Sequence, residues 1–127
     1  MDFIKKAEQL KEHIIALRRD FHQHPELSFQ ETRTSQKVCD ELERLGIPYE
    51  RLDKHCVVGT IVGGLAGEES PVLAIRADMD ALPVTEEADV PFKSQVEGVM
   101  HACGHDGHTA MLLGAAQLLK QAQPELA

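Results

Sequence analysis

The spacing of apolar residues predicts helices at both ends of the chain. Across 3–21, apolar residues recur every three or four positions, which is typical of a helix that buries one face. The pair His24–Pro25 ends this helix, because the residue before a proline disfavours helical backbone. The same spacing returns beyond Gly107 and predicts a last helix that ends near Gln123–Pro124.

A second helix is predicted between residue 28 and residue 45. Ser28 is followed three positions later by Glu31, the spacing of a capping box at a helix start. Gly46 is placed to close the helix at its other end. The residues expected to face the core are Val38, Leu42 and Leu45.

The middle of the chain has the texture of strands, and an α/β fold class follows. The three strand-like segments are Tyr49–Leu52, Val57–Val62 and Pro71–Ala77. Within the last, 72–75 is apolar throughout, as in a strand buried on both faces. The glycine-rich run 63–67 precedes a strand and opens no helix, so it predicts a hairpin turn and not a phosphate loop. Residues 78–100 lack periodicity and are predicted to form a long surface loop.

Composition limits the classes of protein that this chain can belong to. The 127 residues contain 43% hydrophobic side chains and a net charge of −8, which favours a globular domain and argues against nucleic-acid binding. No stretch is long and apolar enough for a membrane span or a secretion signal. Three cysteines, an odd and sparse set, favour a reducing, cytoplasmic location.

Two clusters carry the candidate chemistry. Asp78 and Asp80 directly follow the most apolar strand, where open α/β sheets bind ligands. In extended backbone, His101, Cys103 and His105 point the same way and could converge on a metal ion. Gly104 and Gly107 would allow positive φ angles and a close approach of backbone to that ion. The aspartates could bind the metal or orient a ligand imidazole from behind.

Structural explanations compete with each of these assignments. A cysteine beside a histidine is often only a packing residue, and Asp78 or Asp80 could cap a turn. His22 and His24 lie at a helix end, where interaction with the helix dipole explains them. Cys39 is expected to pack in the core.

Three blocks of sequence stand out when they are taken together. They are Arg18–Leu27 (RRDFHQHPEL), Ile75–Pro83 (IRADMDALP) and Met100–His108 (MHACGHDGH). In this order they resemble the N-acyl amino acid amidohydrolase family. This family includes aminoacylase-like enzymes, hippurate hydrolases, auxin-conjugate hydrolases and N-acetyldiaminopimelate deacetylases, and it is related to dinuclear zinc carboxypeptidases.

The resemblance implies a catalytic domain with a central sheet between helices and two divalent ions, Zn²⁺ or Mn²⁺. Cys103 and His105 match metal ligands of the family, and Asp78 and Asp80 match the acidic motif that supports the metal site. Asp80 is the residue expected behind the ligands, whereas His101 and His108 are expected to shape the site.

The resemblance also implies what the rest of such an enzyme supplies. Residues 1–127 correspond to the N-terminal part of the catalytic domain, and no strand follows the last helix. The general-base glutamate, further ligands and a lid or dimerisation domain are expected elsewhere, in an enzyme expected to form homo-oligomers. The chain alone is therefore expected to lack amidase activity toward N-acyl amino acids, and metal-dependent turnover by the pure chain would contradict this.

Two other functions remain open at this point. The chain could be a non-catalytic module that binds metal or associates with itself through an unpaired sheet edge. It could also be a thiol hydrolase, with Cys103 as nucleophile and His105 or His101 as base. The acidic motif favours a cation over a thiolate nucleophile.

Overall fold

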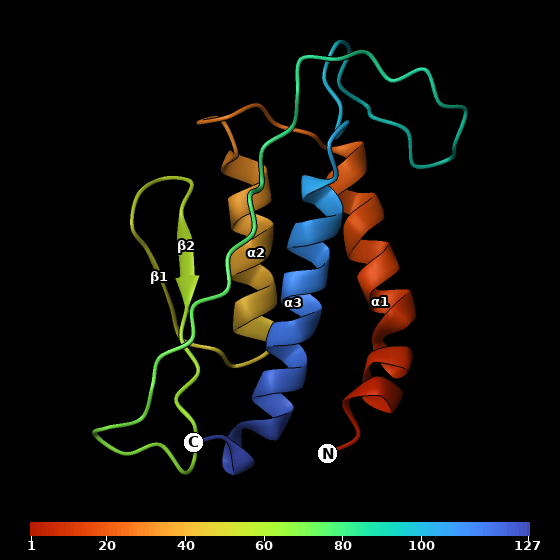
Figure 1. Cartoon of the computed structure of the whole chain (residues 1–127). Coiled ribbons are helices and arrows are strands. Elements are labelled where there is room, and N and C mark those ends of the chain that lie inside the picture. The colour runs from red at the N-terminus through yellow and green to blue at the C-terminus, as the bar shows by residue number, and fades with distance from the viewer.

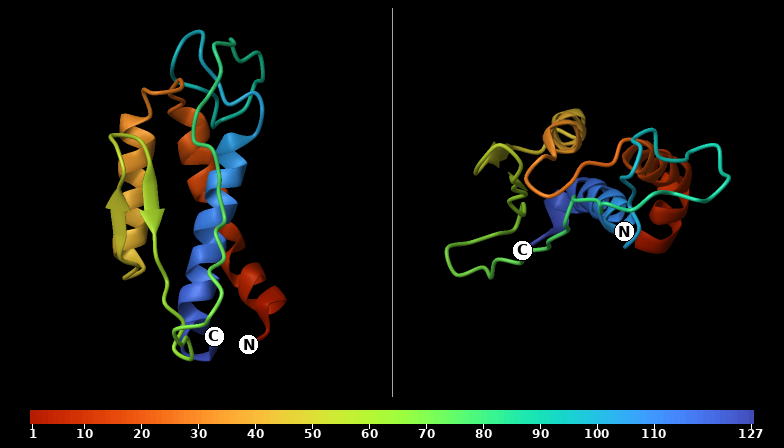
Figure 2. Two further views of the ribbon diagram at one scale, coloured as in Figure 1. Left: turned by 60° about the vertical axis from the view of Figure 1, so that its left-hand side comes forward. Right: turned by 90° about the horizontal axis from the view of Figure 1, so that it is seen from above.

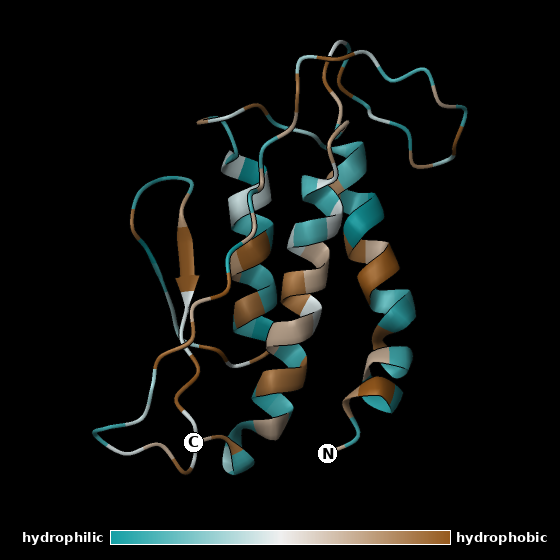
Figure 3. Ribbon diagram, viewed as in Figure 1, coloured by the Kyte–Doolittle hydropathy of each residue, from teal (hydrophilic) through white to brown (hydrophobic).

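The helical spacing of the sequence produces three long helices that lie side by side. The computed structural model describes residues 1–127. Its elements are α1 (Phe3–Gln23), α2 (Thr32–Arg44), β1 (Tyr49–Arg51), β2 (Val57–Gly59), α3 (His105–Ala122) and the short 3-10 helix η1 (Gln123–Glu125). Helix α3 lies between α1 and α2, and the hairpin lies on the outer side of α2 (Figures 1 and 2). Polar and apolar residues share every helix, as expected for helices with one buried face (Figure 3).

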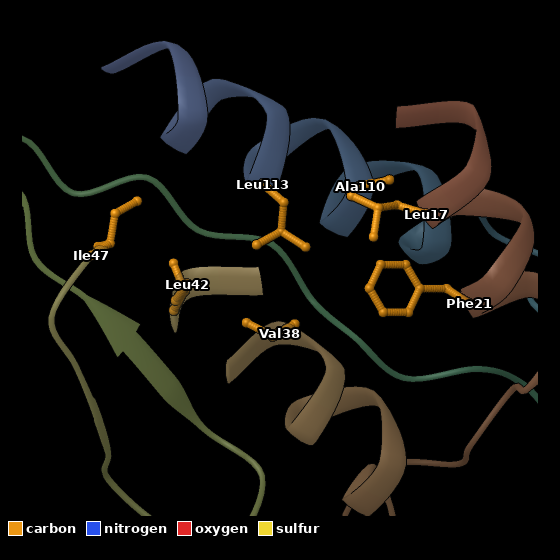
Figure 4. Close-up of a cluster of buried hydrophobic side chains, with 7 residues drawn as sticks. All are labelled: Leu17, Phe21, Val38, Leu42, Ile47, Ala110 and Leu113. Carbon is orange, nitrogen blue, oxygen red and sulfur yellow. The ribbon is translucent and has the colours of Figure 1, made fainter. Parts of the chain in front are cut away.

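The core lies where the inner faces of the helices meet. Its buried apolar side chains are Leu17 and Phe21 of α1, Val38 and Leu42 of α2, Ile47, and Ala110 and Leu113 of α3 (Figure 4). Val38 and Leu42 are buried as predicted, and Leu45 packs against the cluster while partly buried. A side chain at Gly114 would place its Cβ 2.6 Å from Ile14 Cδ1, so the glycine lets α1 approach α3 closely.

The predicted capping box of the second helix is wrong. Helix α2 begins at Thr32, and Glu31 makes no side-chain cap there. Instead, the carboxylate of Glu26 accepts hydrogen bonds from the backbone N–H groups of Arg33 (3.1 Å) and Thr34 (2.6 Å). A carboxylate held in the preceding loop reaches the same orphan N–H groups that a local cap would satisfy, and it leaves Ser28 free for another partner.

Only part of the predicted strand content forms. β1 pairs antiparallel with β2, and Tyr49 stands opposite Gly59. The segment 71–77 has no strand neighbour in the chain, and its Val72 and Leu73 are 96% and 81% exposed. The prediction that this segment is buried on both faces is therefore wrong for these residues, because strand burial requires neighbouring strands and covering layers. The helices and small sheet retain the predicted α/β class.

The glycine-rich run 63–67 forms a turn but joins no pair of strands. The N–H of Gly64 donates to the Gln123 carbonyl (2.7 Å), and the N–H of Leu65 donates to the Leu126 carbonyl (2.8 Å). A Cβ on Gly63 would lie 2.4 Å from the Leu126 carbonyl oxygen, so glycine is required for this approach. The turn therefore binds the backbone of Gln123 and Leu126 near the C-terminus, and it does not form the predicted hairpin.

None of the helices combines the length and the apolar character that crossing a membrane requires.

Truncation of the central aromatic side chain tests the described core. Phe21 is fully buried between the helices, so Phe21→Ala is expected to lower the free energy of unfolding by about 3–5 kcal/mol. Ile4 lies on the same helix and is 77% exposed, so Ile4→Ala is expected to change it by less than about 0.5 kcal/mol. Urea denaturation followed by circular dichroism measures both, and equal losses in the two variants would contradict this core.

Candidate functional site

The two sequence clusters meet at the start of α3. The extended segment that carries Asp80 passes the first residue of this helix, His105. The Nδ1 of His105 lies 2.8 Å from the Asp80 carboxylate and 3.0 Å from the Asp80 backbone carbonyl. Nδ1 donates its hydrogen to these oxygens, so the lone pair of the neutral ring lies on Nε2. A histidine oriented by a carboxylate in this way is a typical metal ligand.

The Asp80 carboxylate is fixed by a second hydrogen bond. The hydroxyl of Ser28 donates to its other oxygen at 2.7 Å. This bond, followed by that from His105, holds the pKa of Asp80 below its ordinary value although partial burial raises it. Asp80 is therefore an anion that keeps one orientation of the imidazole.

Asp78 occupies a different environment from Asp80. Its half-exposed side chain pairs with the exposed guanidinium of Arg76, and surface pairs of this kind contribute little to stability. Its backbone carbonyl accepts a hydrogen bond from the Thr109 hydroxyl (3.0 Å), which ties the segment to α3. Only one aspartate of the acidic motif thus touches the histidine, and the support that both are expected to give to a metal site in catalysis remains a prediction.

Cys103 lies on the bend that leads into α3. It is an exposed free thiol, as is Cys56, whereas Cys39 is buried as expected of a packing residue. Gly104 separates Cys103 from His105 and has a φ of +120°, a backbone conformation that favours glycine. The second glycine of the motif, Gly107, lies inside α3 without a positive φ, so that part of the expectation is wrong.

The three residues His101, Cys103 and His105 do not converge. No group of three or more histidine, cysteine, aspartate or glutamate side chains in residues 1–127 is arranged so that it could hold a metal ion. The expectation fails because it assumed extended backbone through the motif, whereas His105 already belongs to α3. His108 lies on the next turn, its ring centroid 5.9 Å from that of His105.

His101 is buried behind the exposed part of the motif. Its residue is 5% exposed, and neither ring nitrogen has a hydrogen-bond partner. Burial lowers its pKa, because a desolvated ring resists protonation. Its ring lies beside that of His22, with 6.5 Å between centroids.

A buried ionic cluster surrounds His22, and the apolar and polar pattern of the sequence did not predict it. The ring nitrogens of His22 lie 2.8 Å from the Asp106 carboxylate and 2.7 Å from the Glu86 carboxylate. Burial raises the pKa of Glu86, but hydrogen bonds from His22 and from the N–H of Ser94 outweigh it and hold this pKa low. The helix dipole therefore does not account for His22. The sequence offered one indication of this cluster: Arg18 and His22 are spaced so that both lie on one helix face.

His24 behaves differently although it lies two positions further on. Its Nδ1 donates to the backbone carbonyl of Asp20 at 2.8 Å, a local bond at the end of α1. This bond satisfies a carbonyl of the last helical turn, and it agrees with a structural role.

The donor chemistry fits a divalent metal. A thiol at Cys103 and an imidazole at His105 whose Nδ1 is engaged by a carboxylate are ligands of the zinc type. These two residues could supply part of a coordination shell, with Asp80 fixing the imidazole.

Proteins similar to this chain include metal-dependent hydrolases, in agreement with donor chemistry that fits a divalent metal. The model of Peptidase family M20/M25/M40 matches residues 74–127, which include both the acidic motif and the Cys103 motif. The chain is 50% identical over 114 residues to the N-acetylcysteine deacetylase of Bacillus subtilis (strain 168), covering 89% of this chain and 30% of that protein. It is 48% identical over 121 residues to the N-acyl-L-amino acid amidohydrolase of Geobacillus stearothermophilus, covering 94% and 32%.

A solved structure supports the same relationship. The YxeP protein of Bacillus subtilis, described as a dinuclear metal binding peptidase from the M20 family, superposes with a TM-score of 0.86 at 47% identity. The match covers 93% of this chain and 33% of that chain. The chain is thus similar to proteins of the M20 peptidase family, and both the family resemblance and the fold class are confirmed. It spans about a third of the length of the relatives that it matches.

Removal of the Ser28 hydroxyl tests how Asp80 is held. In Ser28→Ala, the largest influence that lowers the pKa of Asp80 is lost, so this pKa is expected to rise toward its ordinary value. Ionised Asp80 stabilises the fold above its unfolded-state pKa, and this contribution disappears as pH falls through the lower folded-state pKa. The free energy of unfolding of the variant should therefore depend less on pH in this acidic range.

The measurement is a carboxyl-carbon NMR titration of the protein without added metal. Ser70→Ala is the control, because the Ser70 hydroxyl contacts only the turn at Gly67. An unchanged Asp80 pKa in Ser28→Ala would show that this hydrogen bond does not hold the carboxylate.

Proposed function

We propose that this chain is part of a metal-dependent hydrolase that cleaves the amide bond of N-acyl amino acids. The observation that carries the proposal is the hydrogen bond between His105 and Asp80, which leaves Nε2 for a metal. Cys103 adds an exposed thiol two positions earlier. The names of two relatives, an N-acetylcysteine deacetylase and an N-acyl-L-amino acid amidohydrolase, supply the proposed bond and substrate class.

The residues of this chain would bind and orient. His105 and Cys103 would hold a divalent ion, zinc or manganese. When bound, the ion supplies Lewis acidity, which polarises an acyl oxygen and makes water a stronger acid. Asp80 keeps the hydrogen of His105 on Nδ1, and Ser28 keeps Asp80 in one orientation. Asp78, whose carboxylate pairs with Arg76 at the surface, would be the second carboxylate of the acidic motif that supports the metal.

The thiol-hydrolase alternative has less support. A nucleophilic cysteine needs a base within hydrogen-bonding distance. Cys103 makes no hydrogen bond to His101 or His105, and His105 directs its Nδ1 to Asp80. An exposed thiol without a base agrees better with a metal ligand.

Metal content tests the proposed site directly. The purified chain, reconstituted with zinc or manganese, is expected to retain close to one equivalent by elemental analysis, and Cys103→Ala is expected to lose most of it. Cys56→Ala is the matched control, because Cys56 is also an exposed free thiol and should leave the metal content unchanged. Equal metal content in all three proteins, or none after reconstitution, would contradict the assignment to Cys103.

Self-association is a second candidate property, favoured by one specific observation. The apolar segment 71–77 is extended, lacks a strand partner in the chain and exposes Val72 and Leu73. Unpaired N–H and C=O groups beside apolar side chains can template pairing with another chain.

Size-exclusion chromatography with light scattering tests this property. The unsubstituted chain is expected to form dimers or larger species, and Val72→Lys combined with Leu73→Lys is expected to shift the mass toward the monomer. Leu52→Lys is the control, because Leu52 is 64% exposed on the hairpin and lies outside the segment. A monomeric unsubstituted chain would reject the idea.

A further inference from the structure

The buried ionic cluster is built around a doubly hydrogen-bonded imidazole. His22 Nδ1 faces Asp106 and His22 Nε2 faces Glu86, and all three side chains are at most 5% exposed. Both ring nitrogens lie within hydrogen-bonding distance of carboxylate oxygens, so the imidazole is held from two sides. Charges at this depth persist only when they are paired and hydrogen-bonded.

The cluster joins three segments that are far apart in the sequence. His22 comes from the end of α1, Asp106 from the first turn of α3 and Glu86 from the 78–100 loop. Arg18 adds an ion pair, with its Nε 2.9 Å from the Asp106 carboxylate. The backbone N–H of Ser94 donates to Glu86 at 2.5 Å, which folds the loop over the cluster.

An aromatic cover closes the cluster from solvent. The Phe92 ring meets the His22 ring edge to face, with 5.8 Å between centroids. The guanidinium groups of Arg18 and Arg19 lie 5.2 and 4.7 Å from the centre of the Phe92 ring. These cation–π contacts hold Phe92 in place, and exclusion of water strengthens the charge pairing beneath it.

The cluster contacts both ends of the segment that carries the proposed metal ligands. His101 precedes Cys103, and its ring lies against that of His22. Asp106 follows His105, and its carboxylate accepts from the same His22 ring. One side chain from α1 therefore lies beside the start of residues 101–106 and is hydrogen-bonded to their end, and the short exposed bend between them carries the thiol.

We propose that His22 is a positioning residue that holds residues 101–106 so that Cys103 and His105 present their ligand atoms together. The proposal rests on the function proposed above. A buried charge cluster is a poor way to gain stability alone, because apolar residues of similar volume often stabilise a core as well or better. What the charges add is directional bonds, which fix the rotation of the first turn of α3 and hence the direction of His105.

Cobalt binding separates positioning from simple stability. Co²⁺ is titrated into the chain, and the thiolate-to-cobalt absorption reports coordination by Cys103 itself. His22→Gln is expected to weaken the apparent Co²⁺ affinity at least about tenfold, the scale found when groups behind metal ligands are removed. Urea denaturation without metal gives the stability of each protein, so binding is compared among folded molecules.

His13→Gln is the matched control. His13 lies on the same helix and contacts a carboxylate, Glu41, at 3.2 Å, but it makes no hydrogen bond or ion pair with residues 101–106. It should leave the cobalt titration unchanged. Glu86→Gln is a milder second variant, for use if His22→Gln does not fold, and it should weaken binding in the same direction.

Amide hydrogen exchange supplies a second readout that needs no metal. The N–H of His108 donates to the Gly104 carbonyl at 3.0 Å and reports the first turn of α3. In His22→Gln, exchange in this turn should accelerate at least about tenfold more than exchange in the middle of α2.

The outcomes are distinguishable. Unchanged cobalt affinity in a folded His22→Gln protein would overturn the positioning role. If the unsubstituted chain shows no thiolate-to-cobalt absorption, the proposed metal site fails, and exchange decides the positioning role by itself. Exchange that rises equally throughout the chain would make His22 a stabilising residue only and would overturn the proposal.

Discussion

The antiparallel packing of α1 against α3 is the contact on which the remaining geometry depends (Figure 1). It brings the C-terminal end of one helix beside the N-terminal end of the other. Gly114 permits the close approach to Ile14, and Phe21 fills the space further along. At the end of this contact, His22 meets Asp106, so packing of apolar side chains decides where a buried charge pair forms. Without the apolar contact, the cost of burying these charges would not be met.

The same pair of chemical groups, imidazole and carboxylate, serves two purposes in this chain. Between His105 and Asp80 the pair is partly exposed, and one ring nitrogen remains available for a ligand. At His22 the pair is buried, and carboxylates engage both ring nitrogens. The first arrangement suits binding, because it orients a lone pair. The second suits mechanical support, because it leaves the ring no free donor or acceptor.

The extended segment 71–77 has backbone groups and apolar side chains that no other part of residues 1–127 pairs or covers. Its apolar side chains have the composition of a buried strand, yet Val72 and Leu73 face solvent. Asp78 and Asp80 follow the segment directly, so the stretch that leads to the candidate site also carries an unpaired edge. Any strand that pairs with this segment would therefore also lie beside the candidate site. The related structure, of which this chain matches about a third, shares this fold.

Local patterns in the sequence determined the three helices, the turn at Gly46 and which residues are candidate metal ligands. These features depend on near neighbours, through apolar spacing, glycine conformations and the order of a short motif. The partner of Asp80, the burial of His101 and the ionic cluster at His22 were decided by tertiary structure. Each depends on residues dozens of positions apart, such as the 84 that separate His22 from Asp106, and helical spacing carries no information about such distances. The capping of α2 by Glu26 was not predicted for a related reason. A local motif and a more distant carboxylate can satisfy the same N–H groups, and only the fold selects between them.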